Sequence, residues 1–299
     1  MTLAILELFI FQLILPTVFT ISLWKGTFPS KLSWLVQTLF TVLFTTWVFF
    51  SSSWDWFSYY LRFLMLFFLF LSTYNSWKKV RSLPFRIKFN RSQKMFLGYN
   101  VLLLLVFGVY NVLIVSGFTT KDVAIELDFP LKAGTYYVGQ GGNHVYINYH
   151  NAYVSQQYAL DIVKLNKFGI RAAGIYPEEL EKYVIYGEQL YSPCTGSVLE
   201  VRNDLPDLTP PNADSENVEG NFLNILCEDE GVNVYIAHMQ KGTVVVKEGE
   251  SIQKGQAIGL VGNSGNTSEP HLHIHAEKNG VGVPIHFSGR FLIKNSLIW

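Results

Sequence analysis

Residues 262–273 read GNSGNTSEPHLH, a turn rich in glycine and asparagine that leads through a proline to two alternating histidines. Pro270 suits the first residue of a β-strand, and residues two apart in a strand share one face at a spacing of about 6.6 Å. His271 and His273 therefore point the same way. Two imidazoles on one strand face beside a tight turn indicate a metal site in a cleft. A lone His-x-His pattern is not specific, so the surrounding sequence decides.

Further ligand-type residues lie upstream of this pair. His238 ends an apolar strand-like segment, and Asp161 lies within another, where an unpaired carboxylate would be costly. His150 precedes Asp161 by eleven residues. Zinc binds imidazole and carboxylate ligands in a tetrahedral set, and a catalytic site uses three of them and leaves the fourth position for water. The sequence offers enough groups for three ligands and for extra histidines that move protons.

From Lys121 onward the chain is built of short β-rich segments separated by Gly, Asn, Asp and Pro clusters. Asp204–Gly220, with three prolines and several acids, is expected to be an exposed loop. We therefore predict a mainly antiparallel β domain over residues 121–299. The expected strands are Gly134–Gln140, Tyr158–Lys164, Gly196–Val201, Leu223–Cys227, Val232–His238, Ala257–Val261 and His271–Glu277.

Residues 1–120 are different, because they contain long apolar runs bordered by aromatic residues, as expected of a membrane region. A helical span needs about 20 mainly apolar residues. Arg62 lies near the end of one stretch, where a long side chain can reach the headgroups. We predict a four-helix transmembrane anchor with spans at about 3–24, 34–50, 57–74 and 96–118. A cleaved signal peptide is the rival for the first stretch, but that stretch has neither a basic start nor an obvious cleavage site.

The charge pattern predicts the orientation of this anchor. Seven Lys or Arg residues and no acid fall within Lys78–Lys94, which is typical of a cytoplasmic loop. The loop with Lys25 and Lys31 then faces the cytoplasm too, and the loop with Asp55 faces out. The chain after about Thr119 is therefore expected to be extracytoplasmic, and so is the N-terminus. The protein as a whole is expected to be integral to the cell membrane through its spans.

Composition narrows the remaining choices. The formal net charge is zero, so nucleic acid is not an expected partner. Cys194 and Cys227 are the two cysteines, and the absence of a Cys-x-x-Cys pair excludes a thiolate zinc knuckle. They could form a disulfide in an oxidising compartment or stay as two small buried residues.

The order of motifs in the second half of the chain resembles a known family. Tyr235–Met239 (YIAHM), Val246–Gly249 (VKEG), Ile252–Gly259 and the run from Gly262 to His273 look like the catalytic domain of lysostaphin/LytM-type zinc metallopeptidases. Upstream, Ser192–Val198 resembles the family's Ala-Pro-x-x-Gly-x-Val strand. The resemblance covers about residues 140–290, half of the chain.

This resemblance implies a small antiparallel β fold with a peptide-binding groove, the duplicated hybrid motif fold, and an endopeptidase that cuts peptides of bacterial peptidoglycan with a bound Zn2+. By position, Asp161 and His273 would bind the metal, and His238 and His271 would be the paired catalytic histidines. Many members have a ligand histidine four residues before the aspartate, where this chain has Gln157. We expect His150 to supply the third ligand, in a branch with a longer first motif. The alternative is that Gln157 marks a weakened or lost zinc site.

Three rival interpretations remain. The domain could have the fold without catalysis and act as a peptidoglycan-binding or regulatory module of an envelope complex. Its Val246–Gly259 segment also resembles a lipoyl or biotinyl carrier domain, but no modifiable lysine stands at an apolar hairpin tip. The spans could themselves transport or sense, but their charged members, Glu7 and Arg62, lie near the ends and form no relay.

Overall fold

The computed structural model describes residues 2–299. The chain forms two compact units. One unit is helical and consists of residues up to Trp54 together with Ser58–Val115. The other consists of Ser116–Trp299 together with the three residues Asp55–Phe57, which lie between two helices in the sequence but belong to the β unit.

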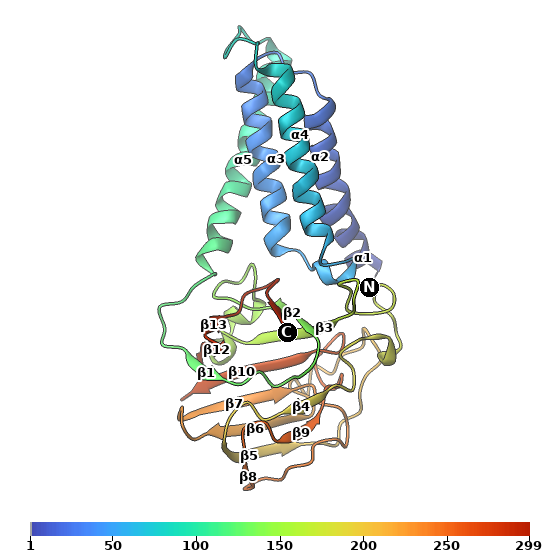
Figure 1. The fold of residues 1–299 in the computed structure, drawn as a ribbon, viewed down its shortest axis with the longest axis vertical. Helices are drawn as coiled ribbons and strands as arrows, with labels where there is room; N and C mark the ends of the chain where they lie inside the picture. Colours follow the sequence, from blue (N-terminus) through green and yellow to red (C-terminus); the bar gives the residue numbers. More distant parts are fainter. Residues whose placement is uncertain (1) are drawn as a thin grey trace. The chain divides into compact units, whose positions relative to one another are not determined.

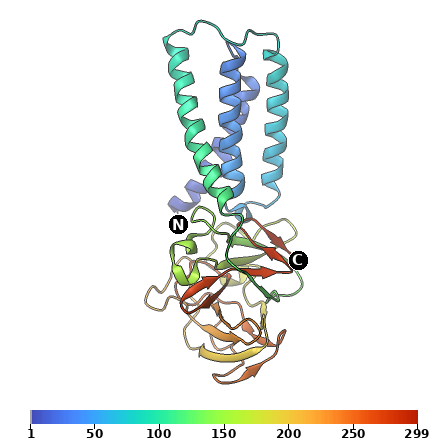
Figure 2. The ribbon, with the colours of Figure 1, turned by 90° about the vertical axis from the view of Figure 1, so that its left-hand side faces the viewer.

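The helical unit is built from long helices that run antiparallel to their neighbours in the sequence (Figures 1 and 2). Ser30 begins one of them with a capping box, in which its side chain and that of Ser33 each accept a backbone N–H. A π-helical stretch precedes Pro16, which has no N–H to donate. The elements of this part of the chain are α1 (Thr2–Glu7), the π-helix η1 (Leu8–Ile14), α2 (Leu15–Lys25), α3 (Lys31–Ser51), the short η2 (Trp54–Trp56), α4 (Leu61–Val80) and α5 (Arg91–Ser116). The last two residues of η2 belong to the β unit.

Three of these helical stretches are long and apolar enough to cross a membrane: Ile5–Lys25, Lys31–Ser51 and Arg91–Ser116. They fit a membrane anchor. The expected span at 57–74 is not among them. Its helix, α4, begins four residues later than expected and extends to Val80, so it takes in the polar run from Ser72 to Ser76 and also Lys78 and Lys79. Three of the four predicted spans therefore correspond to helices that are long and apolar enough to cross a membrane.

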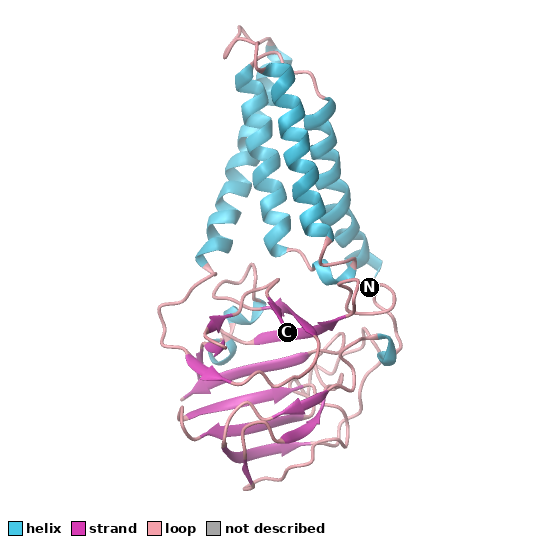
Figure 3. Ribbon diagram, in the orientation of Figure 1, coloured by secondary structure: helices cyan, strands magenta, loops and turns pink. Residues whose placement is uncertain are grey.

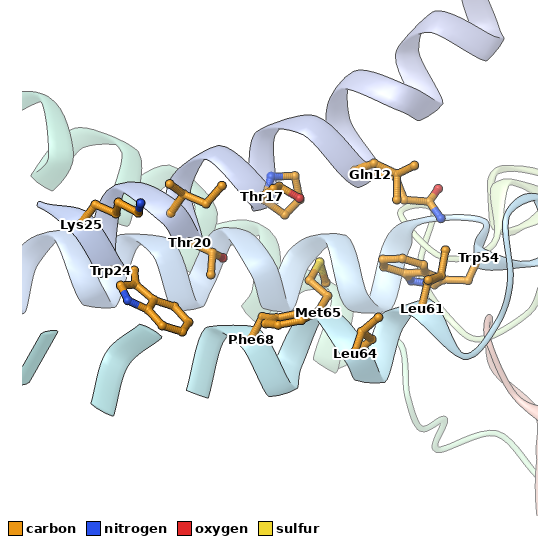
Figure 4. A pocket seen from close by; sticks show the side chains of 13 residues that line it. Gln12, Thr17, Thr20, Trp24, Lys25, Trp54, Leu61, Leu64, Met65 and Phe68 are labelled. Atoms are coloured by element: carbon orange, nitrogen blue, oxygen red, sulfur yellow. The ribbon is translucent and has the colours of Figure 1, made fainter. Parts of the chain in front are cut away.

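Aromatic side chains hold the helical unit together. Phe40, Phe44 and Trp54 are buried at its centre, and Phe44 and Phe107 meet edge to face at a centroid distance of 4.8 Å. Asn111 of α5 donates to the backbone oxygen of Leu43 at 2.8 Å. An apolar cavity of about 530 Å3 lies between η1–α2 and α4, and its lining is shown in Figure 4.

The β unit contains one large antiparallel sheet, shown by the magenta arrows of Figure 3. Its strands follow the order β14-β2-β3-β10-β7-β6-β5-β8, and β11 pairs with β10. Their bounds are β2 (Thr135–Gln140), β3 (Leu160–Leu165), β5 (Gly196–Arg202), β6 (Phe222–Cys227), β7 (Val232–Ala237), β8 (Ser251–Ile252), β10 (Leu272–Lys278), β11 (Val281–Val283) and β14 (Leu297–Ile298). Smaller pieces are β1 (Ile125–Leu127), β4 (Gln189–Tyr191), β9 (Ala257–Leu260), β12 (Ile285–Phe287) and β13 (Arg290–Phe291), of which β1 and β12 pair in parallel.

The two faces of β10 have different surroundings. Leu272, Ile274 and Ala276 point into the apolar core of the β unit, together with Ile162 and Ile236 from the neighbouring strands. Because side chains alternate along a strand, the residues between them, His273 and His275, lie on the opposite face, where they are also buried. The core thus fixes the strand, and the strand presents its histidines on the other side of the sheet.

Cys194 and Cys227 form a disulfide with a Cα–Cα distance of 5.7 Å. Cys227 is the last residue of β6, and the two cysteines are 33 residues apart in the sequence. Both side chains are buried in the core of the β unit. Of the two alternatives that the sequence left open, the structure has the disulfide.

Removing this disulfide is expected to destabilise the β unit. In the chain-entropy model, a loop of this length lowers the free energy of the native state relative to the unfolded state by about 3–4 kcal/mol. The variant Cys194→Ala/Cys227→Ala should lose about this much in denaturant unfolding of the full chain in detergent. Reducing agent should destabilise the parent and leave the double variant unchanged. Equal unfolding midpoints for parent and variant would contradict the prediction.

Candidate metal centre

Two neighbouring strands bring an aspartate and a histidine together. β3 and β10 are antiparallel, and Asp161 stands directly opposite His273 in their register. His273 Nδ1 lies 3.0 Å from Asp161 Oδ1. The β7 strand lies on the other side of β10, and His238 follows its last residue. Residues more than 100 positions apart in the sequence thus meet on one face of the sheet.

His150 reaches the same carboxylate from a short 3-10 helix, η3 (Tyr149–Ala152). Its Nε2 lies 3.0 Å from both oxygens of Asp161. The buried side chain of Asn148 fixes this loop, because its amide donates to the backbone oxygens of Gly142 and Ala159 at 3.0 and 3.1 Å. The Asn148-x-His150 pair in the sequence therefore has a physical meaning: the first residue holds the loop that carries the second.

Gln157, which stands where many family members have a ligand histidine, points elsewhere. Its side-chain amide donates to the backbone oxygen of Gly282 at 3.2 Å, and it belongs to neither of the groups of ligand-type residues described next. The structure therefore brings His150, and not Gln157, to Asp161.

Within residues 2–299, two groups of ligand-type side chains have donor atoms within 4.8 Å of one another. One consists of His150, Asp161 and His273, and the other of His238, His271 and His273. They share His273, so they form one continuous cluster. His144 and His286 belong to neither group.

His238 and His271 each hold one ring nitrogen in a hydrogen bond to the backbone. His238 Nδ1 donates to the oxygen of Ser264 at 2.9 Å, and His271 Nδ1 donates to that of Glu269 at 2.9 Å. These bonds fix the tautomer, so that Nε2 is the free nitrogen of each ring. The Nε2 atom of His271 is buried without a hydrogen-bond partner and lies 3.5 Å from Asp161 Oδ1. The two ring centroids are 4.8 Å apart, and the ring planes are tilted by 58°.

His238 has an unusual backbone. Its φ of +58° is in the left-handed region, which is uncommon for a residue with a Cβ. Hydrogen bonds support it, since its N–H donates to the oxygen of Glu219 at 2.9 Å and its ring is held by Ser264. Backbone strain of this kind concentrates at functional sites.

His275 supports the cluster from behind. Its Nδ1 lies 2.9 Å from Nε2 of His273, and the ring of Tyr235 stacks on it at 4.7 Å. His275 lies two residues after His273 and therefore on the same face of the strand, but the atom that it contacts depends on the rotamers of both rings.

The charges in the cluster depend strongly on one another. Burial alone would raise the pKa of Asp161, but His150 and His271 outweigh it and hold that pKa well below its usual value. Burial lowers the pKa of His273 to about 4, partly offset by its hydrogen bond to Asp161. Burial, reinforced by His271 and His273, lowers the pKa of His238. Burial would likewise lower the pKa of His271, but Asp161 outweighs it and raises that pKa.

These donors suit a divalent metal ion such as zinc. An anionic carboxylate and two imidazoles are a common three-ligand set for catalytic zinc. Tetrahedral bonds of about 2.0–2.1 Å place ligand atoms about 3.3 Å apart, close to the 3.0 Å that separates Asp161 from His150 and from His273. The buried free nitrogen of His271 beside them is a further polar atom that the protein itself does not satisfy.

Comparison with known proteins finds a family match for residues 183–284 of the chain. The model of Peptidase family M23 matches residues 183–284. This range includes His238, His271 and His273, but it begins after His150 and Asp161.

Three solved structures illustrate the likeness. A zinc-containing peptidase from Vibrio cholerae is 19% identical over 54% of this chain and 39% of its own, with a TM-score of 0.33. The catalytic domain of lysostaphin from Staphylococcus simulans is 20% identical over 37% of this chain and 83% of its own, with a TM-score of 0.24. A complex of SpoIIIAH and SpoIIQ gives 14% identity over 52% of this chain and 95% of the other, with a TM-score of 0.35. This chain thus spans about two fifths of the length of the Vibrio peptidase.

Residues 183–284 of the mainly antiparallel β unit, which include His238, His271 and His273, are therefore a Peptidase family M23 domain, and this domain follows apolar helices that fit a membrane anchor.

Proposed function

We propose that the protein is a membrane-anchored zinc metalloendopeptidase that cleaves peptide bonds in peptidoglycan. One observation carries this proposal: Asp161 contacts both His150 and His273, and two further histidines, His238 and His271, stand beside this set with their Nδ1 atoms held by backbone oxygens. A site that only binds peptide has no need of two additional oriented imidazoles. The match of residues 183–284 to Peptidase family M23 supports peptide-bond hydrolysis as the reaction class.

We assign the metal to His150, Asp161 and His273 rather than to the all-histidine group. The first set contains an anionic ligand, and its three residues are buried. His238 and His271 remain for proton chemistry, since their Nδ1 atoms are already engaged with the backbone. His273 is common to both groups and is the residue on which the centre most depends.

When bound, zinc would supply a Lewis acid that polarises the scissile carbonyl and lowers the pKa of water. His271 presents its free Nε2 beside Asp161, where it can accept a proton from the attacking water. His238 presents its Nε2 next to His271 and can hydrogen-bond the developing oxyanion or protonate the leaving amine. The backbone oxygens of Ser264 and Glu269 hold these two rings in place throughout.

We further propose that α4 is a fourth span and that the β unit is extracytoplasmic. Helix α4 packs against α2 and α3. The one charged residue near its outer end is Arg62. The guanidinium of Arg62 donates a hydrogen bond to the backbone oxygen of Phe49 at 3.0 Å and lies over the aromatic ring of Phe49. The seven basic residues of Lys78–Lys94 favour the cytoplasm for the α4–α5 connection, so the end of α5 and all that follows would face the cell wall.

The test of the function uses the full chain, purified in detergent, loaded with zinc and incubated with purified peptidoglycan. We expect soluble fragments that carry new peptide amino termini, identified by mass spectrometry. A chelator should abolish their release and added zinc should restore it.

Two outcomes would point elsewhere. A parent chain that binds no zinc and releases no fragments would favour a catalytically inactive domain that binds peptidoglycan or regulates an envelope complex. Fragments without new peptide termini would indicate cleavage of the glycan instead. Either result would overturn the proposed function.

A further inference from the structure

Arg171 is a buried cation of the β unit that lies outside the histidine cluster. Its side chain is 7% exposed. It is held by two carboxylates: Nε donates to Oδ2 of Asp55, and Nη1 donates to Oε1 of Glu269 at 2.6 Å. A buried charge is costly without such partners. The two ion pairs therefore hold the side chains of Arg171, Asp55 and Glu269 in fixed positions relative to one another.

Asp55 comes from a distant part of the sequence, between α3 and α4, although it belongs to the β unit. It is completely buried. Its backbone oxygen also accepts the N–H of Arg171 at 3.0 Å, so it holds this residue by both main chain and side chain. The neighbouring Trp56 lies under the guanidinium of Arg171 at 4.6 Å and stacks on Tyr176 at 3.9 Å.

Glu269 connects this ion cluster to the metal centre. Its side chain is bound by Arg171, and its backbone oxygen accepts the hydrogen bond from His271 Nδ1 at 2.9 Å. The same oxygen accepts the hydroxyl of Thr267 at 2.8 Å. Pro270 follows directly and restricts the backbone of Glu269 to extended conformations. The ion pair that holds the Glu269 side chain therefore also helps to fix the backbone carbonyl of Glu269, which orients the ring of His271.

We propose that Asp55 is a positioning residue for His271, acting through Arg171 and Glu269; its effect on catalysis rests on the proposed function. Asp55 touches neither the reacting atoms nor the ligand set. It fixes Arg171, Arg171 fixes Glu269, and the Glu269 carbonyl holds the proton-accepting ring in its tautomer. A fragment that begins at Ser116 lacks Asp55 and leaves Arg171 with one carboxylate instead of two.

The test replaces Asp55 in the full chain by Asn, which keeps the shape and removes the charge. In the metal-free protein, amide hydrogen exchange of peptides covering residues 267–272 should become about tenfold faster, since a hydrogen bond to a charged group is weakened. In the zinc-loaded protein, kcat should fall about 10- to 100-fold, as for other residues that orient a metal-site histidine. KM and bound zinc should stay within about twofold of the parent.

Glu188→Gln is the matched control. It removes the charge of another ion pair of the same unit, with Lys164 at 2.8 Å, and contacts none of the histidines. It should change neither the exchange of 267–272 nor kcat. Should Asp55→Asn fail to fold, Glu269→Gln tests the same path from its partly exposed end. If both fold, the double variant should lower kcat no further than one of the single variants.

Exchange at 267–272 that equals the parent's would overturn the proposal, and so would faster exchange spread evenly over the β unit, which marks a general loss of stability. If the parent chain releases no fragments from peptidoglycan, the proposed function fails. The exchange of the metal-free protein then still decides whether Asp55 positions this segment.

Discussion

His273→Ala is expected to remove both the bound zinc and the release of peptidoglycan fragments. His273 is shared by the two groups of ligand-type residues, and its Nδ1 lies 3.0 Å from Asp161. Without it, a three-ligand site loses one ligand, and the chemistry that depends on the metal is lost with it. We expect kcat/KM to fall by roughly 1,000-fold or more. The measurement is elemental analysis of bound zinc together with the fragment-release assay.

His286→Ala is the control for this prediction, because it removes an imidazole of the same unit that lies outside both groups. It should keep zinc and activity at the level of the parent. A His273→Ala chain that still binds one zinc per molecule would show that the metal lies elsewhere.

His271→Ala should separate metal binding from catalysis. His271 lies outside the proposed ligand set, and its Nδ1 is engaged by Glu269. Its loss should leave bound zinc unchanged. The loss of a general base costs about 100- to 10,000-fold in kcat, so we expect a fall of this size with little change in KM. His238→Ala should behave in the same way, since the free nitrogen of its ring faces the same cluster.

Zinc content is the measurement that interprets these two variants. If His271→Ala lost its zinc, the all-histidine group of His238, His271 and His273 would be the ligand set, and the division of roles proposed above would be wrong. If kcat stayed within about threefold of the parent, the proton would be accepted by another group.

Much of the β unit could be predicted from the sequence, because its central strands carry strong alternation and are bounded by turn residues. Each of the seven expected strands has a counterpart, for example β6 (Phe222–Cys227) and β10 (Leu272–Lys278). The missed strands are short. β8 and β13 have two residues each, too few for a period of two to show. They form because a neighbouring edge offers hydrogen-bond partners, which is information that a local pattern lacks.

In the helical unit, α4 shows the limit of reading hydropathy alone. Its first half is apolar, and this half suggested a span. Its second half contains Ser72 and Ser76, which are buried against other helices. Ser72 donates to the backbone oxygen of Thr20 at 2.7 Å. Polar residues of this kind serve helix packing, and the sequence alone does not separate that use from exposure to water.

In the candidate site, too, local sequence patterns suggest some residues, whereas others come together only through the tertiary fold. His271 and His273 lie two apart on one strand and His238 ends another, so local patterns could suggest them. The opposition of Asp161 and His273 needs the pairing of β3 with β10, which was not available from spacing. The backbone oxygens of Ser264 and Glu269 and the Asp55–Arg171 pair left no signal in the sequence, since backbone partners and long-range ion pairs depend on the finished fold.

The most direct test of the central claim is the zinc content of three full-length chains: the parent, His150→Ala and Gln157→Ala. His150 contacts both oxygens of Asp161, whereas Gln157 is bonded to the oxygen of Gly282. We predict about one zinc per chain in the parent and in Gln157→Ala, and little or none in His150→Ala. Zinc that is retained in His150→Ala but lost in Gln157→Ala, or absent from the parent, would contradict the account.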